Sequence, residues 1–308
     1  MFKKFIKVFI SFFIIFSIVF AGSIFYLSKG SDVENESLKD AFNNNSGDSI
    51  NFLLMGVDSQ ESNETSNVRT DTLMVFNVNK SSGEISILSI PRDTRTPIEG
   101  RKYQEKINHT HVYGGPELVL ETVSDLLNLD LEYYVVADYK FVEEFVDLIG
   151  GVEIDVPMDM KYEDPVAEPP LYIDIKEGVQ TLNGDKSLQY LRFRKGYADA
   201  DLGRIRAQQS FMKSLVKQTL KPLNILKAPL MLKAYNENID TNISLGTIAK
   251  YSLKFNKYDL ANMNTETLPG DAKTIKGVSY FIHSEEKTKT LVKEMFRKYD
   301  DYVAFIEN

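Results

Sequence analysis

The sequence predicts an α/β domain in which helices flank a mixed sheet in a layered α/β/α arrangement, preceded by one transmembrane helix. Three observations predict this fold class. Apolar runs rich in β-forming residues open the folded part, a short turn makes two of them antiparallel, and later strands alternate with amphipathic helices without an internal repeat. With 308 residues and 43% hydrophobic content, the chain can bury one large core or two modest ones.

The first 48 residues predict a membrane anchor and a tether. Residues 1–7 carry three lysines, and residues 8–27 contain no charge and are long enough to span a bilayer. The basic flank predicts a cytoplasmic N-terminus and an extracellular location for everything after the span. A signal peptide cleaved after Ala21 is the alternative. The polar residues 28–48 are predicted to be an extracellular tether to the folded domain at 49–308.

The domain begins with three apolar runs that predict strands, at 50–57, 72–78 and 84–90. A turn of five residues joins the last two runs and makes them an antiparallel hairpin. In such a hairpin the start of one strand lies beside the end of its partner. Asp71 and Arg92 are therefore predicted to meet at one edge of the sheet. Asp58 joins them if the first strand is also antiparallel to the second.

The remaining chain alternates between helical and extended patterns. Helices are predicted at 116–127, 141–149, 182–191, 205–220, 245–253 and 284–298. Strands are predicted at 133–136, 152–156, 171–175, 262–268 and 280–282. Pro116 lies in the first turn of its helix, and Gly150 follows the last turn of another, which are the positions that these residue types favour.

A cluster of cations lies near the middle of the domain, although the net charge of the protein is -8. Five cations fall within 15 residues, namely Arg192, Arg194, Lys195, Arg204 and Arg206. Guanidinium groups pair well with phosphate oxygens, so the cluster indicates a bound multivalent anion. The alternative is a solvated surface on which Asp199 and Asp201 are the local partners.

The predicted local structure separates the arginines of this cluster. Alternate residues of an extended segment share a face, so Arg192 and Arg194 would both point toward the anion. Asp201 is a plausible N-cap of the next helix, which places Arg204 in its first turn. At about 100° per residue, Gln208 returns to the face of Arg204, whereas Arg206 lies about 200° away.

Composition excludes several other kinds of site. The chain contains no cysteine, which excludes disulfides, thiolate metal sites and cysteine nucleophiles. Its acidic balance argues against a nucleic-acid partner. Asp58 and Asp71 could hold a divalent cation such as Mg²⁺ beside a bound phosphate. His109 and His111 lack a clear third ligand, so local hydrogen bonding is favoured over metal binding.

Five segments occur in the order seen in the LytR-CpsA-Psr family, which the chain therefore resembles: NFLLMGVDS, VRTDTLMVFNVN, ILSIPRDT, KINHTHVYGG and YLRFRKGYADADLGRIRAQQ. A later segment, LPGDAKTIKGVSYFIHSEE, extends the resemblance to nearly the whole ectodomain. The resemblance implies transfer of a teichoic acid or capsular glycopolymer from an undecaprenyl-pyrophosphate carrier to peptidoglycan. The resemblance further implies that the product is a phosphodiester. It would form on the outer side of a cell membrane that the protein crosses once, in a Gram-positive-type envelope.

The resemblance also implies roles for individual residues. Asp58 and Asp71 match the ligands of Mg²⁺, which Mn²⁺ could replace. The pyrophosphate-contacting arginines match Arg69, Arg92, Arg192, Arg194 and Arg204. Lys106, Asn108 and Gln208 are further candidates for substrate binding. Ala207 departs from the pattern, since the family usually has an arginine there. An apolar tunnel for the polyprenyl tail is also implied.

Several alternatives remain open at this point. The general base for the acceptor hydroxyl could be Asp93 or Asp201. A pyrophosphate hydrolase would use the same metal and arginines with water as the acceptor, and a non-enzymatic cell-wall binding module would use none of this chemistry. A DNA-binding regulator is a further class, against which the predicted export and the acidic charge both count.

Overall fold

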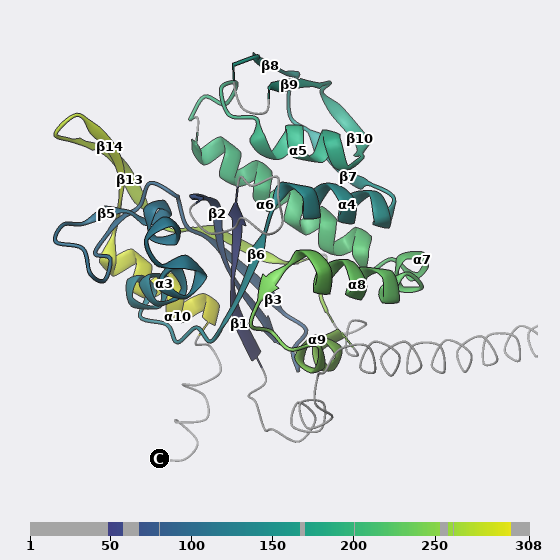
Figure 1. Cartoon of the computed structure of the whole chain (residues 1–308), viewed down its shortest axis with the longest axis horizontal. Coiled ribbons are helices and arrows are strands. Elements are labelled where there is room, and N and C mark those ends of the chain that lie inside the picture. Colours follow the sequence, from purple (N-terminus) through teal and green to yellow (C-terminus); the bar gives the residue numbers. More distant parts are fainter. Residues whose placement is uncertain are drawn as a thin grey trace, which may run out of the picture.

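The computed structural model describes residues 49–57, 68–79, 81–166, 170–199, 201–252, 258–260 and 262–296 (Figure 1). The expected anchor at 8–27, the expected tether and Asp58 lie outside these ranges. Within the described ranges, none of the helices has the length and apolar character that crossing a membrane requires.

A mixed six-stranded sheet forms the centre of the domain. Its strand order is β11 (Asp240–Thr241), β6 (Tyr133–Ala137), β1 (Ser49–Val57), β2 (Thr70–Asn79), β3 (Ile85–Ser89) and β12 (Asn264–Thr267). The predicted hairpin is β2–β3, and β1 is antiparallel to β2. Strand β6 runs parallel to β1, and β12 runs parallel to β3. The prediction of a mixed sheet is therefore confirmed.

The register brings four strand ends to one edge of this sheet. Val57 lies opposite Thr70, so the end of β1 adjoins the start of β2, and the end of β3 lies on the other side of β2. Ala137 at the end of β6 pairs with Gly56. A Cβ on Gly56 would lie 2.9 Å from the Cβ of Thr72, so only glycine fits this close approach. We call this end of the sheet the site edge.

One face of the sheet is covered by α3 (Thr110–Leu127) and α10 (Glu285–Phe296). The short 3₁₀ helix η1 (Ile107–His109) immediately precedes α3. Inward-facing residues of the strands alternate in the sequence, as in Leu53, Met55 and Val57 of β1. Gly114 and Gly115 have non-helical backbone angles, so the regular part of α3 starts at Pro116 as predicted. The helical turn before these glycines was not predicted.

The opposite face is covered by α6 (Asp201–Thr219). Its residues Met212 and Val216 pack on a second apolar cluster that includes Phe76 and Ile87. The amide of Gln209 donates to Ser89 Oγ at 3.0 Å, to the Glu266 carbonyl at 2.9 Å and to Thr267 Oγ1 at 3.2 Å. These bonds fix the N-terminal half of α6 over β3 and β12.

A second lobe packs on the other side of α6 (top of Figure 1). It contains α4 (Tyr139–Ile149), β7 (Val152–Val156), β8 (Met160–Asp164), β9 (Leu171–Ile175), β10 (Gly178–Leu182) and α5 (Gly184–Arg192). Ala207 and Phe211 of α6 belong to the apolar core of this lobe. The sequence predicted α4, β7, β9 and α5 but missed β8 and β10, which pair with β9 and β7.

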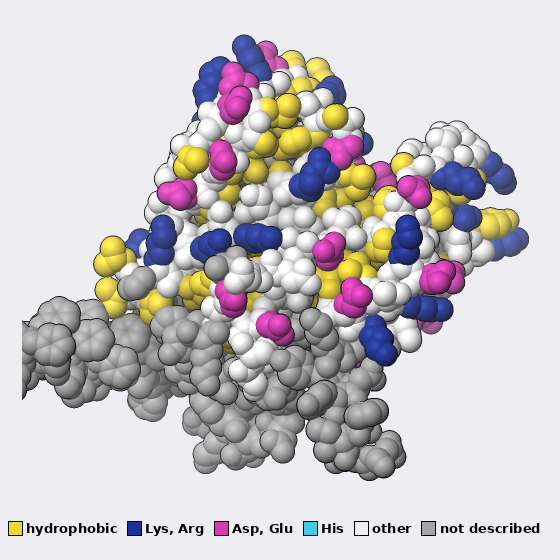
Figure 2. Space-filling model, turned by 180° about the vertical axis from the view of Figure 1, so that it is seen from behind, with side chains coloured by type: hydrophobic (Ala, Val, Ile, Leu, Met, Phe, Trp, Pro, Cys, Tyr) yellow, Lys and Arg dark blue, Asp and Glu magenta, His cyan; other side chains and the backbone are white. Residues whose placement is uncertain are grey.

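The remaining elements lie at the periphery of the domain. They are β4 (Arg95–Thr96), β5 (Glu105–Lys106), α7 (Pro222–Ile225), α8 (Ala228–Asn238), α9 (Leu245–Ser252), β13 (Gly270–Ile275) and β14 (Val278–His283). Strands β13 and β14 form a hairpin that projects from the body (Figure 1). The surface is hollowed between this hairpin and the second lobe (Figure 2).

Candidate functional site

Asp71 and Arg92 meet at the site edge, as the hairpin predicts. Asp71 is the second residue of β2, and Arg92 follows the end of β3, where Ile90 still donates to the Leu73 carbonyl at 2.9 Å. The Arg92 guanidinium donates from Nη1 to Asp71 Oδ1. Thr94 Oγ1 donates to the Pro91 carbonyl at 2.6 Å and so fixes the turn that carries Arg92.

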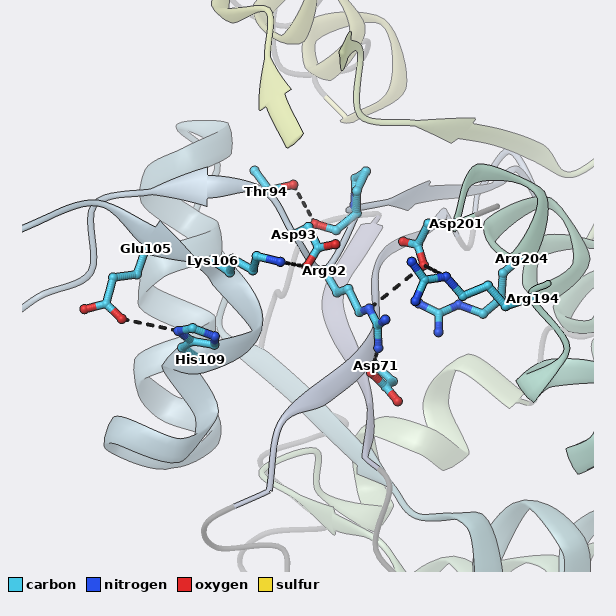
Figure 3. Close-up of polar contacts among 11 residues, drawn as sticks. Asp71, Arg92, Asp93, Thr94, Glu105, Lys106, His109, Arg194, Asp201 and Arg204 are labelled. Carbon is cyan, nitrogen blue, oxygen red and sulfur yellow. Dashed lines mark hydrogen bonds and ion pairs between the residues drawn. The ribbon is translucent and has the colours of Figure 1, made fainter. Parts of the chain in front are cut away.

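Asp201, the first residue of α6, lies among three guanidinium groups (Figure 3). Its Oδ1 is 2.8 Å from Arg204 Nη2, 3.6 Å from Arg194 Nε and 3.9 Å from Arg92 Nε. The three arginines come from α6, from the segment after α5 and from the turn after β3. The site edge, the second lobe and α6 therefore converge on a single carboxylate.

The guanidinium groups at this point are short of acceptors. The Nε atoms of Arg92 and Arg204 are buried, and no described residue accepts a hydrogen bond from either. The Arg204 side chain is only 8% exposed. Burial lowers the pKa of Arg204, and repulsion by Arg92 and Arg194 adds to this effect, while Asp201 opposes it. Buried donors without partners favour binding of an oxygen-rich anion.

The pKa of Arg92 is shifted in the opposite direction to that of Arg204. Burial would lower it, but the carboxylates of Asp71, Asp201 and Asp93 outweigh burial, and the pKa is raised. Arg92 thus remains charged, as arginine does in proteins generally. Its guanidinium lies between Asp71 of β2 and Asp201 of α6.

Arg206 points away from the cluster. Its Nη1 and Nη2 donate to the two carboxylate oxygens of Asp199 at 2.6 and 2.9 Å, and its side chain is 61% exposed. These hydrogen bonds to Asp199 raise the pKa of Arg206. The helical phase predicted for α6 therefore agrees with the positions of Arg204 and Arg206.

The prediction that Arg192, Phe193 and Arg194 form one extended segment is wrong. Arg192 is the last residue of α5, and Phe193, which follows it, has an extended backbone. Phe193 is buried in the core of the second lobe, and the Arg192 guanidinium lies 5.1 Å from the centre of the Tyr139 ring. Among the described contacts, Arg194 reaches Asp201, whereas Arg192 stacks on Tyr139.

Lys106 and Asn108 lie beside the cluster because their backbone is paired with the turn after β3. Lys106 Nζ is 2.8 Å from Asp93 Oδ1. The backbone N–H of Asn108 donates to the Arg92 backbone carbonyl at 3.2 Å. In the side chain, the buried Asn108 Oδ1 has no hydrogen-bond partner among the described residues. Both candidates are therefore positioned next to Arg92.

The other two substrate-binding candidates differ in burial. Gln208 is 6% exposed and lies on α6 one turn after Arg204. Arg69 is exposed and immediately precedes β2. Gln209, which the sequence analysis did not single out, has a structural role through its three hydrogen bonds.

The two histidines make local hydrogen bonds. His111 is buried with Nδ1 2.9 Å from the Val68 carbonyl, and burial lowers its pKa. His109 Nδ1 lies 3.3 Å from Glu105 Oε2. In the part of the chain that the structure describes, no three His, Asp or Glu side chains are grouped to hold a metal ion. Asp71 is the described member of the expected metal pair, and its side chain is 26% exposed.

The sequence understated the importance of Asp201, which it predicts as a helix cap, a candidate base or a surface partner of the arginines but not as the centre of the cluster. A sequence signal did exist, since an aspartate between two groups of arginines is expected to pair with them. The assembled site presents three guanidinium groups that converge on the Asp201 carboxylate, with one ammonium group and two further carboxylates, those of Asp71 and Asp93, at its border. Such a site can bind a diphosphate and stabilise charge on it.

A protein-family model and several known proteins match most of the chain. Residues 22–297 match the model of the LytR_cpsA_psr family. A Halalkalibacterium halodurans protein named polyisoprenyl-teichoic acid–peptidoglycan teichoic acid transferase TagU is 33% identical over 258 residues, 83% of this chain and 81% of that protein. A Bacillus subtilis protein of the same name is 27% identical over 251 residues, 82% of this chain and 78% of that protein.

Solved structures share the fold. The crystal structure of Bacillus subtilis TagV aligns with a TM-score of 0.70 at 25% identity, covering 82% of this chain and 98% of that chain. A structure titled TagT bound to LI-WTA aligns with a TM-score of 0.63 at 26% identity, covering 80% and 89% of the two chains. The mixed α/β architecture is therefore common to this chain and to these proteins.

Proposed function

The chain belongs to the LytR-CpsA-Psr family, and from that premise we propose that it transfers a glycopolymer phosphate from a polyprenyl-pyrophosphate carrier to peptidoglycan. One observation carries the proposal. Three guanidinium groups surround Asp201 Oδ1, and two of them keep buried Nε donors for which no described residue is an acceptor. A pyrophosphate supplies the acceptor oxygens that this arrangement lacks.

The arginines bind and neutralise the pyrophosphate. Arg92, Arg194 and Arg204 lie close enough to one another to contact neighbouring phosphate oxygens. Phosphoryl transfer depends mainly on positioning and on stabilising the charge of the transferred group, so fixed guanidinium groups suit this reaction. Arg69, Arg192, Lys106, Asn108 and Gln208 are proposed as additional contacts to the substrate.

In the proposed reaction, an acceptor hydroxyl oxygen of peptidoglycan forms a bond to the phosphorus that carries the glycopolymer. The bond from this phosphorus to the bridging oxygen breaks, and polyprenyl phosphate leaves with that electron pair. The hydroxyl proton passes to a carboxylate. Asp93 suits this task better than Asp201, because Asp93 pairs with one ammonium group, that of Lys106, while Asp201 lies among three guanidinium groups.

A divalent cation is part of the proposal. Asp71 and Asp58 would hold Mg²⁺, or Mn²⁺, which would supply further neutralisation of the pyrophosphate charge. Asp71 fits this role because its carboxylate is partly exposed at the site edge, beside the end of β1. The Asp71 carboxylate would then contact both Arg92 and the cation.

The proposed location follows from the carrier. A polyprenyl substrate lies in the bilayer, so an anchor at residues 8–27 would keep the domain near the outer surface of the cell membrane. The carrier is expected to be undecaprenyl pyrophosphate, and the glycopolymer is expected to be of the teichoic acid or capsular type.

A test uses the full chain in lipid vesicles with a polyprenyl-pyrophosphate-linked saccharide, with and without peptidoglycan. A transferase releases polyprenyl phosphate in proportion to added peptidoglycan. Release that does not depend on peptidoglycan, with accumulation of the free phosphorylated saccharide, would instead establish a hydrolase.

A further inference from the structure

The hairpin of β13 and β14 is attached to the body only near its base. Phe281 is buried, donates from its amide to the Asp93 carbonyl at 2.9 Å and forms a bridge with Thr94. Beyond this attachment most of the hairpin residues are exposed. An isolated two-stranded ribbon in water gains little stability from its own contacts, so the hairpin depends on its attachment at Phe281.

Tyr280 connects this hairpin to the arginine cluster. The guanidinium of Arg95 lies 5.7 Å from the centre of the Tyr280 ring, and the ammonium of Lys106 lies 5.9 Å from it. Lys106 also pairs with Asp93, the neighbour of Arg92 in the sequence. Lys106 therefore lies beside both the Tyr280 ring and Asp93, the carboxylate that we propose as the base.

A second ribbon, formed by β4 and β5, continues the same surface. Strand β4 lies beside β14, and the segment between β4 and β5 carries Tyr103, which is 70% exposed. Tyr113 of α3 is 42% exposed. Its hydroxyl donates to Glu105 Oε2 at 2.7 Å, which fixes its ring against this segment.

Each of these three tyrosines carries a cation on its ring. Arg101 lies 4.3 Å from the centre of Tyr113, and Lys102 lies 5.4 Å from that of Tyr103. We define the aromatic–cation face as Tyr103, Tyr113 and Tyr280 with Lys102, Arg101 and Arg95. It combines rings that can stack on the C–H faces of sugars with cations that can pair with carboxylates.

The charge of this region differs from that of the whole protein. The segment from Arg92 to Lys106 contains five cations and three carboxylates, whereas the net charge of the chain is -8. The hairpin adds Lys273 and Lys276 against one aspartate. Figure 2 shows Lys and Arg side chains gathered on the side of the molecule from which the hairpin projects. An anionic partner is therefore attracted to this side.

We propose that the aromatic–cation face binds the acceptor, an anionic glycan strand of peptidoglycan with its peptide carboxylates. This inference rests on the proposed function, since it names the subsite for the second substrate. A strand that stacks on Tyr280 can present a hydroxyl to Asp93 from one side while the arginines hold the pyrophosphate on the other. Exposed leucines that could contact a lipid lie on α6, α7 and α8, as Leu202, Leu223 and Leu230, while the hairpin carries the exposed Val278.

The experiment compares the full-length wild type with Tyr280→Ala, Tyr280→Phe and Tyr103→Ala, each in detergent micelles. Affinity for soluble, uncrosslinked glycan strands is measured without donor. Loss of one stacked ring is expected to weaken strand binding by about 2- to 12-fold, since such contacts contribute about 0.5–1.5 kcal/mol. Tyr280→Phe keeps the ring and should bind as the wild type does. Tyr172→Ala, which changes a tyrosine of the second lobe that is 58% exposed, is the control.

Two further readouts separate this inference from the proposed function. In transfer assays, Tyr280→Ala should raise the KM for the strand while its affinity for a polyprenyl-pyrophosphate-linked monosaccharide stays unchanged. Unchanged strand affinity in both Tyr280→Ala and Tyr103→Ala would overturn the inference even if the wild type transfers. A loss of donor affinity in Tyr280→Ala would overturn it as well, by assigning the ring to the donor. Failure of the wild type to transfer counts against the proposed function, while strand affinity still decides the inference.

Discussion

Arg204 and Arg206 are separated by one residue of α6 but have opposite surroundings. The Arg204 side chain is 8% exposed and contacts Asp201, whereas the Arg206 side chain is 61% exposed and pairs with Asp199. Only Arg204 shares its carboxylate partner with two other guanidinium groups. The helix thus directs one arginine into the site and the other into solvent.

Arg204→Ala is predicted to reduce transfer by about 10³-fold, as expected for a group that stabilises developing charge. Arg206→Ala is predicted to change transfer little, because its ion pair is exposed and contributes under about 1 kcal/mol. Rates with a lipid-linked donor test this, with circular dichroism to confirm folding. Similar losses in both variants would show that the site is not built on the Arg204 face.

Asp201→Asn is predicted to lower the free energy of unfolding by about 1–3 kcal/mol, because three guanidinium groups lose their shared partner. Added inorganic pyrophosphate should raise the Tm of this variant more than that of the wild type, since the anion replaces the missing charge. Asp199→Asn is the control, and its response to pyrophosphate should match the wild type. The same pyrophosphate response in all three proteins would argue against anion binding at Asp201.

The two adjacent glutamines of α6 are predicted to have different roles. Gln209→Ala should lower the free energy of unfolding by about 1–3 kcal/mol, because three hydrogen bonds to β3 and β12 are lost. Gln208→Ala should mainly weaken donor binding. Urea unfolding and donor titration of both variants measure the difference. A larger stability loss in Gln208→Ala than in Gln209→Ala would contradict the assignment.

Glu105 is predicted to make stability depend on pH. The hydrogen bond from Tyr113 lowers the pKa of Glu105 to about 2, with smaller contributions from His109 and Arg101. Because the folded-state pKa lies below the ordinary value of 4.5, the carboxylate stabilises the folded state above that pH. This stabilisation is lost as the pH falls toward about 2.

Glu105→Gln should therefore be less stable than the wild type at pH 7, and the difference should shrink at pH 3. Urea unfolding at several pH values measures it. Tyr113→Phe removes the strongest hydrogen bond and brings the folded-state pKa of Glu105 closer to 4.5, so its loss of stability on acidification should be smaller and should end at a higher pH. A difference between Glu105→Gln and the wild type that does not change with pH would contradict the assignment.

Local patterns in the sequence predicted the parts of the fold that depend on short-range geometry. A five-residue turn and Pro91 defined the hairpin, and its register was sufficient to bring Asp71 to Arg92. The helical phase after Asp201 likewise separated Arg204 from Arg206. Each prediction required only the periodicity of one hairpin or one helix and the residue at which it begins.

Other features depend on tertiary packing and could not be read locally. The contact of Asp201 with Arg92 requires α6 to cross the end of β3, which packing on the sheet determines. Strands β8 and β10 were missed because exposed residues alternate along them and leave only short apolar patterns. Arg192 joined α5 rather than an extended segment, since burial of Tyr190 and Phe193 fixes where the helix ends.

The most direct test of the account is mass spectrometry of peptidoglycan that has been incubated with the full chain in vesicles and a polyprenyl-pyrophosphate-linked saccharide, and then digested with a muramidase. The account predicts glycan fragments that carry the saccharide through a phosphodiester, in amounts equal to the polyprenyl phosphate released, and their near absence with Arg204→Ala. Release of polyprenyl phosphate without any modified fragment, or equal modification by the wild type and Arg204→Ala, would contradict it.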